Sequence, residues 1–172
     1  MHLHSARTSA RVDGSGGLIL LEDQDRSLWN KKLIQSGLSW LELSAQGNNY
    51  SRYHAEAAIS AEHCLAPSFS TTRWDQIVHH YDLLLSVAPS AILQLNRAIA
   101  IAEATGPAEA LAVLEHLLPP TWLVTSYLWA AALADLHLRN GSPGLANEYI
   151  AKAYESAPTP AVKALLRHRF EA

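Results

Sequence analysis

Three apolar runs of the chain share one spacing, and this repeat restricts the fold more than any other feature. Each run places three apolar residues four and then three positions apart. These residues are Ile77, Tyr81 and Leu84; Ala110, Leu114 and Leu117; and Ala146, Ile150 and Ala153. Because steps of three and four bring side chains onto one face of an α-helix, the runs predict three similar helices. Prolines follow each run, at 89, 119–120 and 158, and are expected to end the helices.

The distance between the runs indicates which kind of helical repeat they form. Their first residues are numbers 77, 110 and 146, which lie 33 and 36 positions apart. Tetratricopeptide (TPR) repeats are helix pairs with a period of about 34 residues. Small residues such as Ala98 and Ala134 fall where the first helix of each pair needs close approach. The spacing predicts three TPR-like pairs, over residues 51–89, 90–119 and 122–158.

Composition also favours helix throughout the chain. Ala and Leu supply 55 of the 172 residues and Val only 6, and Ala and Leu lose little on entering a helix. We predict an all-α fold, a TPR-like antiparallel helix-pair stack of about eight helices with a short hairpin or turn near the N-terminus. The expected helices cover residues 22–46, 51–65, 72–87, 91–104, 108–118, 123–139, 143–156 and 160–170. Their plausible N-caps include Thr71, Ser90, Ser142 and Thr159.

The predicted organisation is one helical domain over residues 1–172. It comprises an N-terminal turn segment (1–24), a first long helix (25–50), the three pairs (51–158) and a capping helix (159–172). In the turn segment, Asp13 precedes a glycine-rich stretch, which is typical of a tight turn. Gly47-Asn48-Asn49 is expected to end the first long helix.

The first long helix carries an apolar stripe that contains a glycine. Trp29, Leu33, Trp40 and Leu41 are expected on this stripe, in the core. Gly37 lies on the same stripe, although a glycine within a helix costs about 1 kcal/mol relative to alanine. We therefore expect a neighbouring element to approach closely at Gly37.

The sequence contains no familiar motif of a metal site, a nucleotide-binding site or a catalytic site. The nine histidines and Cys64 show no zinc-like spacing, and no HExxH, P-loop, GxGxxG or GxSxG motif occurs. We predict no catalytic residue, no metal and no cofactor. A net charge of −3 argues against nucleic-acid binding by this chain. No apolar run is long enough to span a bilayer, and a single cysteine fits a reducing compartment, so a soluble cytoplasmic protein is expected.

An acidic cluster precedes the first long helix and admits three interpretations. Glu22, Asp23 and Asp25 stand beside Arg26. They could be catalytic carboxylates or a cation site, or a surface that engages a partner protein. The favoured interpretation is an N-terminal cap, because carboxylates there complement the helix dipole.

Several strings in the chain resemble the C-terminal extension of a group of extracytoplasmic-function RNA polymerase sigma factors. The most distinctive string runs from Leu20 to Trp29 and reads LLEDQDRSLW. Further strings are ARVD at 10–13, WDQI at 74–77, YDLL at 81–84 and LNRAIA at 95–100; beyond Trp122 the match is looser. The resemblance covers nearly the whole chain, but the two sigma domains, regions 2 and 4, are absent from it.

The resemblance implies a bacterial regulatory domain that modulates transcription initiation by contacting sigma regions 2 and 4, RNA polymerase or a signalling partner. The candidate protein-interaction residues are Arg11, Asp13, Glu22, Asp23, Asp25, Arg26, Trp29, Asn96 and Arg97. Residues 11–29 are the expected docking face. The alternatives are a free-standing TPR-like adaptor unrelated to transcription and a helical domain that binds a small ligand.

Overall fold

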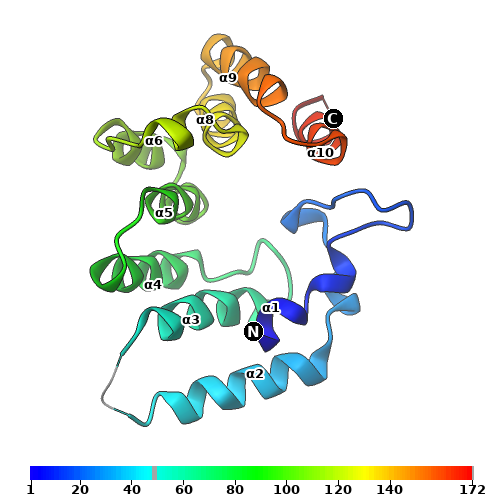
Figure 1. Ribbon diagram of the computed structural model, residues 1–172, viewed down its shortest axis with the longest axis vertical. Coiled ribbons are helices and arrows are strands. Elements are labelled where there is room, and N and C mark those ends of the chain that lie inside the picture. The colour runs from blue at the N-terminus through cyan, green and yellow to red at the C-terminus, as the bar shows by residue number, and fades with distance from the viewer. Residues whose placement is uncertain (48–49, 172) are drawn as a thin grey trace. The chain divides into compact units, whose positions relative to one another are not determined.

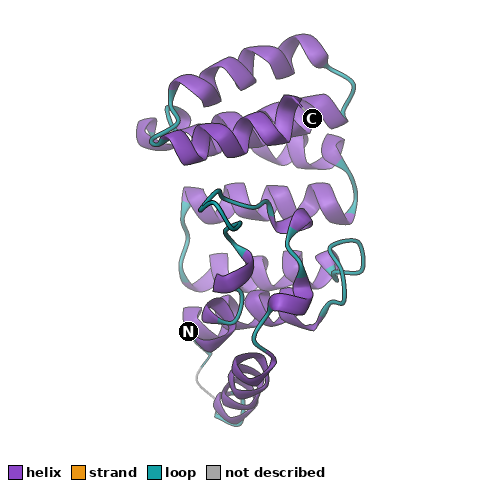
Figure 2. Cartoon of the chain, turned by 90° about the vertical axis from the view of Figure 1, so that its right-hand side faces the viewer, coloured by secondary structure: helices purple, strands orange, loops and turns teal. Residues whose placement is uncertain are grey.

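The computed structural model describes residues 1–47 and 50–171, and within these the regular structure is helical (Figures 1 and 2). Ten α-helices and three short 3-10 helices are present in this part of the chain. The prediction of an all-α chain is confirmed. The predicted stop signal at Gly47-Asn48-Asn49 falls partly outside the described residues, because Asn48 and Asn49 are not among them.

The predicted helix pairs correspond to helices that pack together. The first pair is α3 (Arg52–Leu65) with α4 (Trp74–Val87), and the second is α5 (Ala91–Ala104) with α6 (Pro107–Glu115). The third is α8 (Tyr127–Arg139) with α9 (Pro143–Glu155). The predicted helix over 123–139 is divided, since a short α7 (Thr121–Val124) precedes α8.

The residues of the repeat lie where the spacing places them. Ile77, Ala110 and Ala146, the first residue of each run, are all buried. Among the third residues, Leu84 and Ala153 are buried as well, with Ala153 fully inaccessible. The helical face inferred from the four-and-three spacing is therefore the packed face.

Contacts within the chain define two compact units, Met1–Pro89 and Ser90–Ala172, which we describe separately. In the first unit, α1 (His2–Ser5) packs on both α2 (Lys31–Ser44) and α3 (Figure 1). In the second unit, α8 contacts α5, α6, α7 and α9, and α10 (Pro160–Glu171) packs on α9. A small apolar core there joins Ala130, Ala153 and Leu166 from α8, α9 and α10.

Gly37 provides the close approach that its position in the first long helix suggested. A Cβ atom at Gly37 would lie 2.7 Å from Cγ of Leu3, a residue of α1 that is only 4% exposed. Glycine thus allows the short N-terminal helix to lie directly against α2. The sequence had not indicated α1 itself.

The N-terminal turn segment contains the predicted hairpin. Val12 and Leu18 form an isolated antiparallel bridge, and the amide of Asp13 donates to the carbonyl of Gly17 at 2.9 Å. The Asp13 carboxylate accepts hydrogen bonds from the amides of Ser15 and Gly17, both at 2.8 Å. The hydroxyl of Ser15 also donates to this carboxylate at 2.7 Å, and this bond, followed by those from the two amides, lowers the pKa of Asp13.

The predicted start of the first long helix is wrong. Helix α2 begins at Lys31, with the side chain of Asn30 accepting from the amide of Leu33 at 3.1 Å as the N-cap. The acidic residues lie upstream, where Leu21–Asp23 and Arg26–Leu28 form two 3-10 turns separated by extended backbone. Glu22, Asp23 and Asp25 therefore do not cap α2. Asp25 caps the second 3-10 turn, accepting from the amide of Ser27 at 2.8 Å.

Two further local predictions also need correction. Trp40 does not share the core with Trp29, because its side chain is 64% exposed while Trp29 is 3% exposed. Trp29 precedes α2, which begins at Lys31. The 3-10 turn Arg26–Leu28 therefore sets the position of Trp29, and the apolar stripe of α2 does not. Similarly, the N-cap of α4 is Arg73 and not Thr71.

Candidate interaction surfaces

The segment that resembles a sigma-factor extension is an excursion of the chain closed at its base. The amide of Asn30 donates to the carbonyl of Ala6 at 2.9 Å, and Oγ of Ser9 donates to the carbonyl of Leu28 at 2.8 Å. These two bonds join the start and the end of the excursion. Residues 10–28 therefore form a loop of the first unit whose two ends are held together.

Arg26 fastens this excursion to the C-terminal end of α3. Its guanidinium donates to the carbonyls of His63 at 2.8 Å and Ala66 at 2.7 Å, and to Oγ1 of Thr72 at 3.3 Å. The last carbonyls of a helix lack partners within the helix, and a cation favours the negative end of its dipole. Arg26, predicted as a docking residue, thus satisfies acceptors within its own unit.

Trp29 is the second residue of the predicted docking face that lies inside the unit. The guanidinium carbons of Arg7 and Arg26 lie over its ring, 5.0 and 4.8 Å from the centroid. Such cation–π contacts hold charged groups against an aromatic face. Trp29 and Arg26 therefore anchor the excursion, and sequence reasoning did not identify Arg7 as their partner.

The other candidate interaction residues within 11–29 are exposed. They are Arg11, Asp13, Glu22, Asp23 and Asp25. Asp13 and Asp25 hold turns, as described above. Asn96 and Arg97 belong to α5, in the second compact unit, and both are half-buried.

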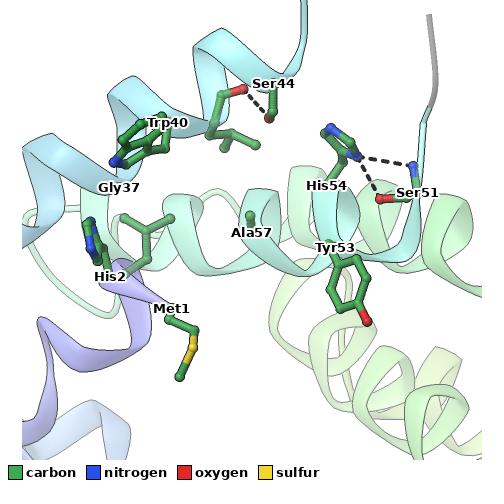
Figure 3. A pocket seen from close by; sticks show the side chains of 11 residues that line it. Met1, His2, Gly37, Trp40, Ser44, Ser51, Tyr53, His54 and Ala57 are labelled. Carbon is green, nitrogen blue, oxygen red and sulfur yellow. Dashed lines mark hydrogen bonds between the residues drawn. The ribbon is translucent and has the colours of Figure 1, made fainter. Parts of the chain in front are cut away.

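A first groove of the N-terminal unit, here called the Trp40 groove, measures about 550 Å³. Helices α1, α2 and α3 contribute to it, and Figure 3 shows Trp40, Tyr53 and His54 around it. Trp40 and Tyr53 are 64% and 71% exposed. His54 accepts at Nδ1 from the amide of Ser51 at 3.1 Å, which pins the start of α3. The groove offers apolar surface, and Oγ of Ser51 lies 2.9 Å from Nδ1 of His54 within it (Figure 3).

A second groove, here called the Lys31 groove, measures about 480 Å³ and lies between the start of α2 and the end of α3. Its lining residues are Arg26, Ser27, Trp29, Lys31, Ile34, Gln35, Leu38, Cys64, Leu65, Ala66 and Pro67. Arg26 and Lys31 supply its positive charges. The side chains of Ile34, Leu38 and Leu65 supply apolar surface beside it.

One buried ion cluster lies between α3 and α4. The Glu62 carboxylate is buried and accepts two hydrogen bonds from the Arg73 guanidinium, both at 2.8 Å. Nε2 of His80 lies 3.7 Å from the same carboxylate. Burial lowers the pKa of His80, against the effect of Glu62. Because Arg73 satisfies both oxygens, the cluster is a structural tie between the helices.

No group of three or more His, Cys, Asp or Glu side chains in the described residues is placed to hold a metal ion. Within the same residues, no helix combines the length and the apolarity needed to cross a membrane. Neither observation identifies a function.

Comparison with known proteins finds matches to parts of the chain. An uncharacterized protein of Rhizobium meliloti (strain 1021) is 37% identical to the chain over 115 residues, which is 67% of the chain. The chain spans 27% of the length of that relative. No solved structure matches the chain. The N-terminal part of the first unit, residues 1–45, matches a family of unknown function, DUF6596, and this stretch contains the Arg26-fastened excursion.

Proposed function

We propose that the chain is a regulatory protein-interaction domain of an extracytoplasmic-function sigma factor. It acts in the bacterial cytoplasm and modulates transcription initiation by contacting sigma regions 2 and 4, RNA polymerase or a signalling partner. It performs no catalysis and does not itself bind nucleic acid. Its role is to present helical surfaces to other proteins.

The observation that carries this proposal is the excursion over residues 10–28. The string LLEDQDRSLW, which begins in the excursion and ends at Trp29, resembles the sigma-factor extension. Two residues of this string, Arg26 and Trp29, anchor the excursion to the rest of the first unit. A fastened loop presents its exposed side chains in a fixed arrangement, which favours recognition because less ordering is needed on binding. The exposed Arg11, Glu22 and Asp23 are then the residues that would contact a partner.

The proposal is tested by run-off transcription with a full-length factor that contains this domain. Deletion of the domain should change promoter-dependent transcription severalfold. In the intact factor, Arg11→Ala combined with Asp23→Ala should reproduce part of that change. The matched control is Arg167→Ala, which removes an exposed arginine from α10.

The possible outcomes test the regulatory role and the position of the docking face separately. Equal transcription by the deleted and the intact factor would reject the regulatory role and favour an adaptor unrelated to transcription. An effect of deletion without an effect of the double substitution would keep the role but place the docking face outside residues 11–29. Chemical denaturation of each variant shows that the fold is retained.

A further inference from the structure

The Lys31 groove combines two positive charges with an apolar floor. Arg26 enters from the excursion and Lys31 from the first turn of α2. No Asp or Glu is present among the residues that line it in the described part of the chain. The lining residues therefore carry a net charge of +2. The nearby Asp25 carboxylate is not among them and accepts from the amide of Ser27 at 2.8 Å.

The first turn of α2 adds to this imbalance. Carboxylates are favoured at this end of a helix because the dipole and the unpaired amides are positive there. Here the first turn carries Lys31 and Lys32, and no acidic residue of the turn opposes them. The local arrangement opposes helix stability, whereas an anion bound in the groove would meet Lys31 and the positive end of the helix dipole together.

A further arginine contacts Trp29, a residue that lines the groove. Arg7 is packed over the Trp29 ring, and its Nε is buried without a hydrogen-bond partner among the described residues. Burial lowers the pKa of Arg7, and the charges of Arg11 and Arg26 lower it further; Cys64 alone acts in the opposite direction. Among the described residues, no carboxylate is among the groups that shift the pKa of Arg7. Arg7 thus adds a further positive charge beside Trp29, a residue that lines the groove.

We propose that the Lys31 groove binds a segment of a partner protein in which acidic side chains alternate with apolar ones. Carboxylates of the segment pair with Lys31 and the positive start of α2, and its apolar side chains cover Ile34, Leu38 and Leu65. A protein segment is favoured over nucleic acid because the chain as a whole carries a charge of −3, which repels a long polyanion. The inference rests on the proposed function only in that the partner is a protein.

The test measures fluorescence anisotropy of a labelled peptide of alternating glutamate and leucine, titrated with the purified chain. Lys31→Glu should weaken binding roughly tenfold or more, since a charge-assisted contact becomes a repulsion. This variant is expected to fold, because a carboxylate in the first turn suits the helix dipole. Lys163→Glu, an identical change of charge at an exposed site in α10, should leave binding unchanged.

Three results would overturn the proposal. The first is no binding of the glutamate peptide, or equal binding of a peptide with glutamine in place of glutamate. The second is equal weakening by Lys31→Glu and Lys163→Glu, which would indicate a nonspecific charge effect. The third is tighter binding of a labelled single-stranded DNA, lost in Lys31→Glu, which would assign the groove to nucleic acid. Since no step uses transcription, a failed titration alongside a positive run-off assay would reject the groove's chemistry and leave the regulatory role standing.

Discussion

At the scale of single residues, Arg26 shows how a feature of the sequence acquired a different role in the structure. Its position in an acidic, sigma-like string suggested an exposed contact for a partner. Its guanidinium instead meets two carbonyls at the end of α3 and the ring of Trp29. A residue exposed for docking would contribute little to stability, whereas these contacts predict that Arg26 stabilises the fold.

We predict that Arg26→Ala lowers the free energy of unfolding by roughly 1–3 kcal/mol, because hydrogen bonds to a charged donor are lost and helix-end carbonyls are left without it. Urea denaturation of the purified chain measures the change. Arg26→Lys should recover only part of the loss, since an ammonium cannot reproduce the planar guanidinium. The exposed Arg167→Ala serves as control, and equal stability of Arg26→Ala and Arg167→Ala would contradict the anchoring role.

His63 supplies a prediction about pH at the same scale. Burial, with the charges of Arg7, Arg26 and His4, lowers its pKa from 6.5 to about 4. Between these values the unfolded chain binds a proton at His63 that the folded chain does not. Stability contributed by the neutral imidazole is therefore complete above pH 6.5 and is lost as the pH falls toward 4.

The slope attributable to His63 in this window is at most about 1.4 kcal/mol per pH unit. It is isolated by comparing unfolding of the wild type and His63→Gln at several pH values. His4 and His80 also have lowered pKa values, so the wild type alone does not separate the contributions. The exposed His116→Gln is the control, and a wild-type pH profile parallel to that of His63→Gln would refute the assignment.

At the scale of elements, the packing of α8 on α9 follows the repeat closely. Ala146 and Ala153 are both fully buried on the face that the four-and-three spacing identified. Their small side chains let the two helices lie close together. By contrast, the predicted start of α2 is wrong, because Asn30 caps the helix and the acidic residues lie in and beside 3-10 turns upstream of it. Helical periodicity thus located packed faces well and helix starts less well.

We predict that Ala146→Leu destabilises the chain by about 1–3 kcal/mol, because added methyl groups have no space between α8 and α9. The midpoint of chemical denaturation reports the change. Ala151→Leu is the matched control, since Ala151 is an exposed alanine of the same helix. An unchanged midpoint for Ala146→Leu would mean that the inferred register of the repeat is incorrect.

At the scale of the whole molecule, two compact helical units present grooves and exposed loops, and the prediction of a single domain over 1–172 stays a prediction. The absence of a structural metal is likewise a prediction from residue spacing. Treatment with a chelator should leave the melting temperature unchanged, because no ligand spacing in the sequence suits a structural site. A fall of several degrees that zinc reverses would refute it.

The sequence alone determined those features that depend on residues close together in the chain. Alanine and leucine content, proline positions and a spacing near 34 residues specify helices, their packed faces and their pairing, because each depends on residues close together in the chain. The close approach at Gly37 and the hairpin at Asp13 were predictable for the same reason. Only the tertiary structure decided that Leu3 fills the space at Gly37, that Arg26 and Arg7 lie over Trp29, and that Lys31 lines a groove. These contacts join residues distant in sequence, and no local periodicity encodes which side chains a closed excursion brings together.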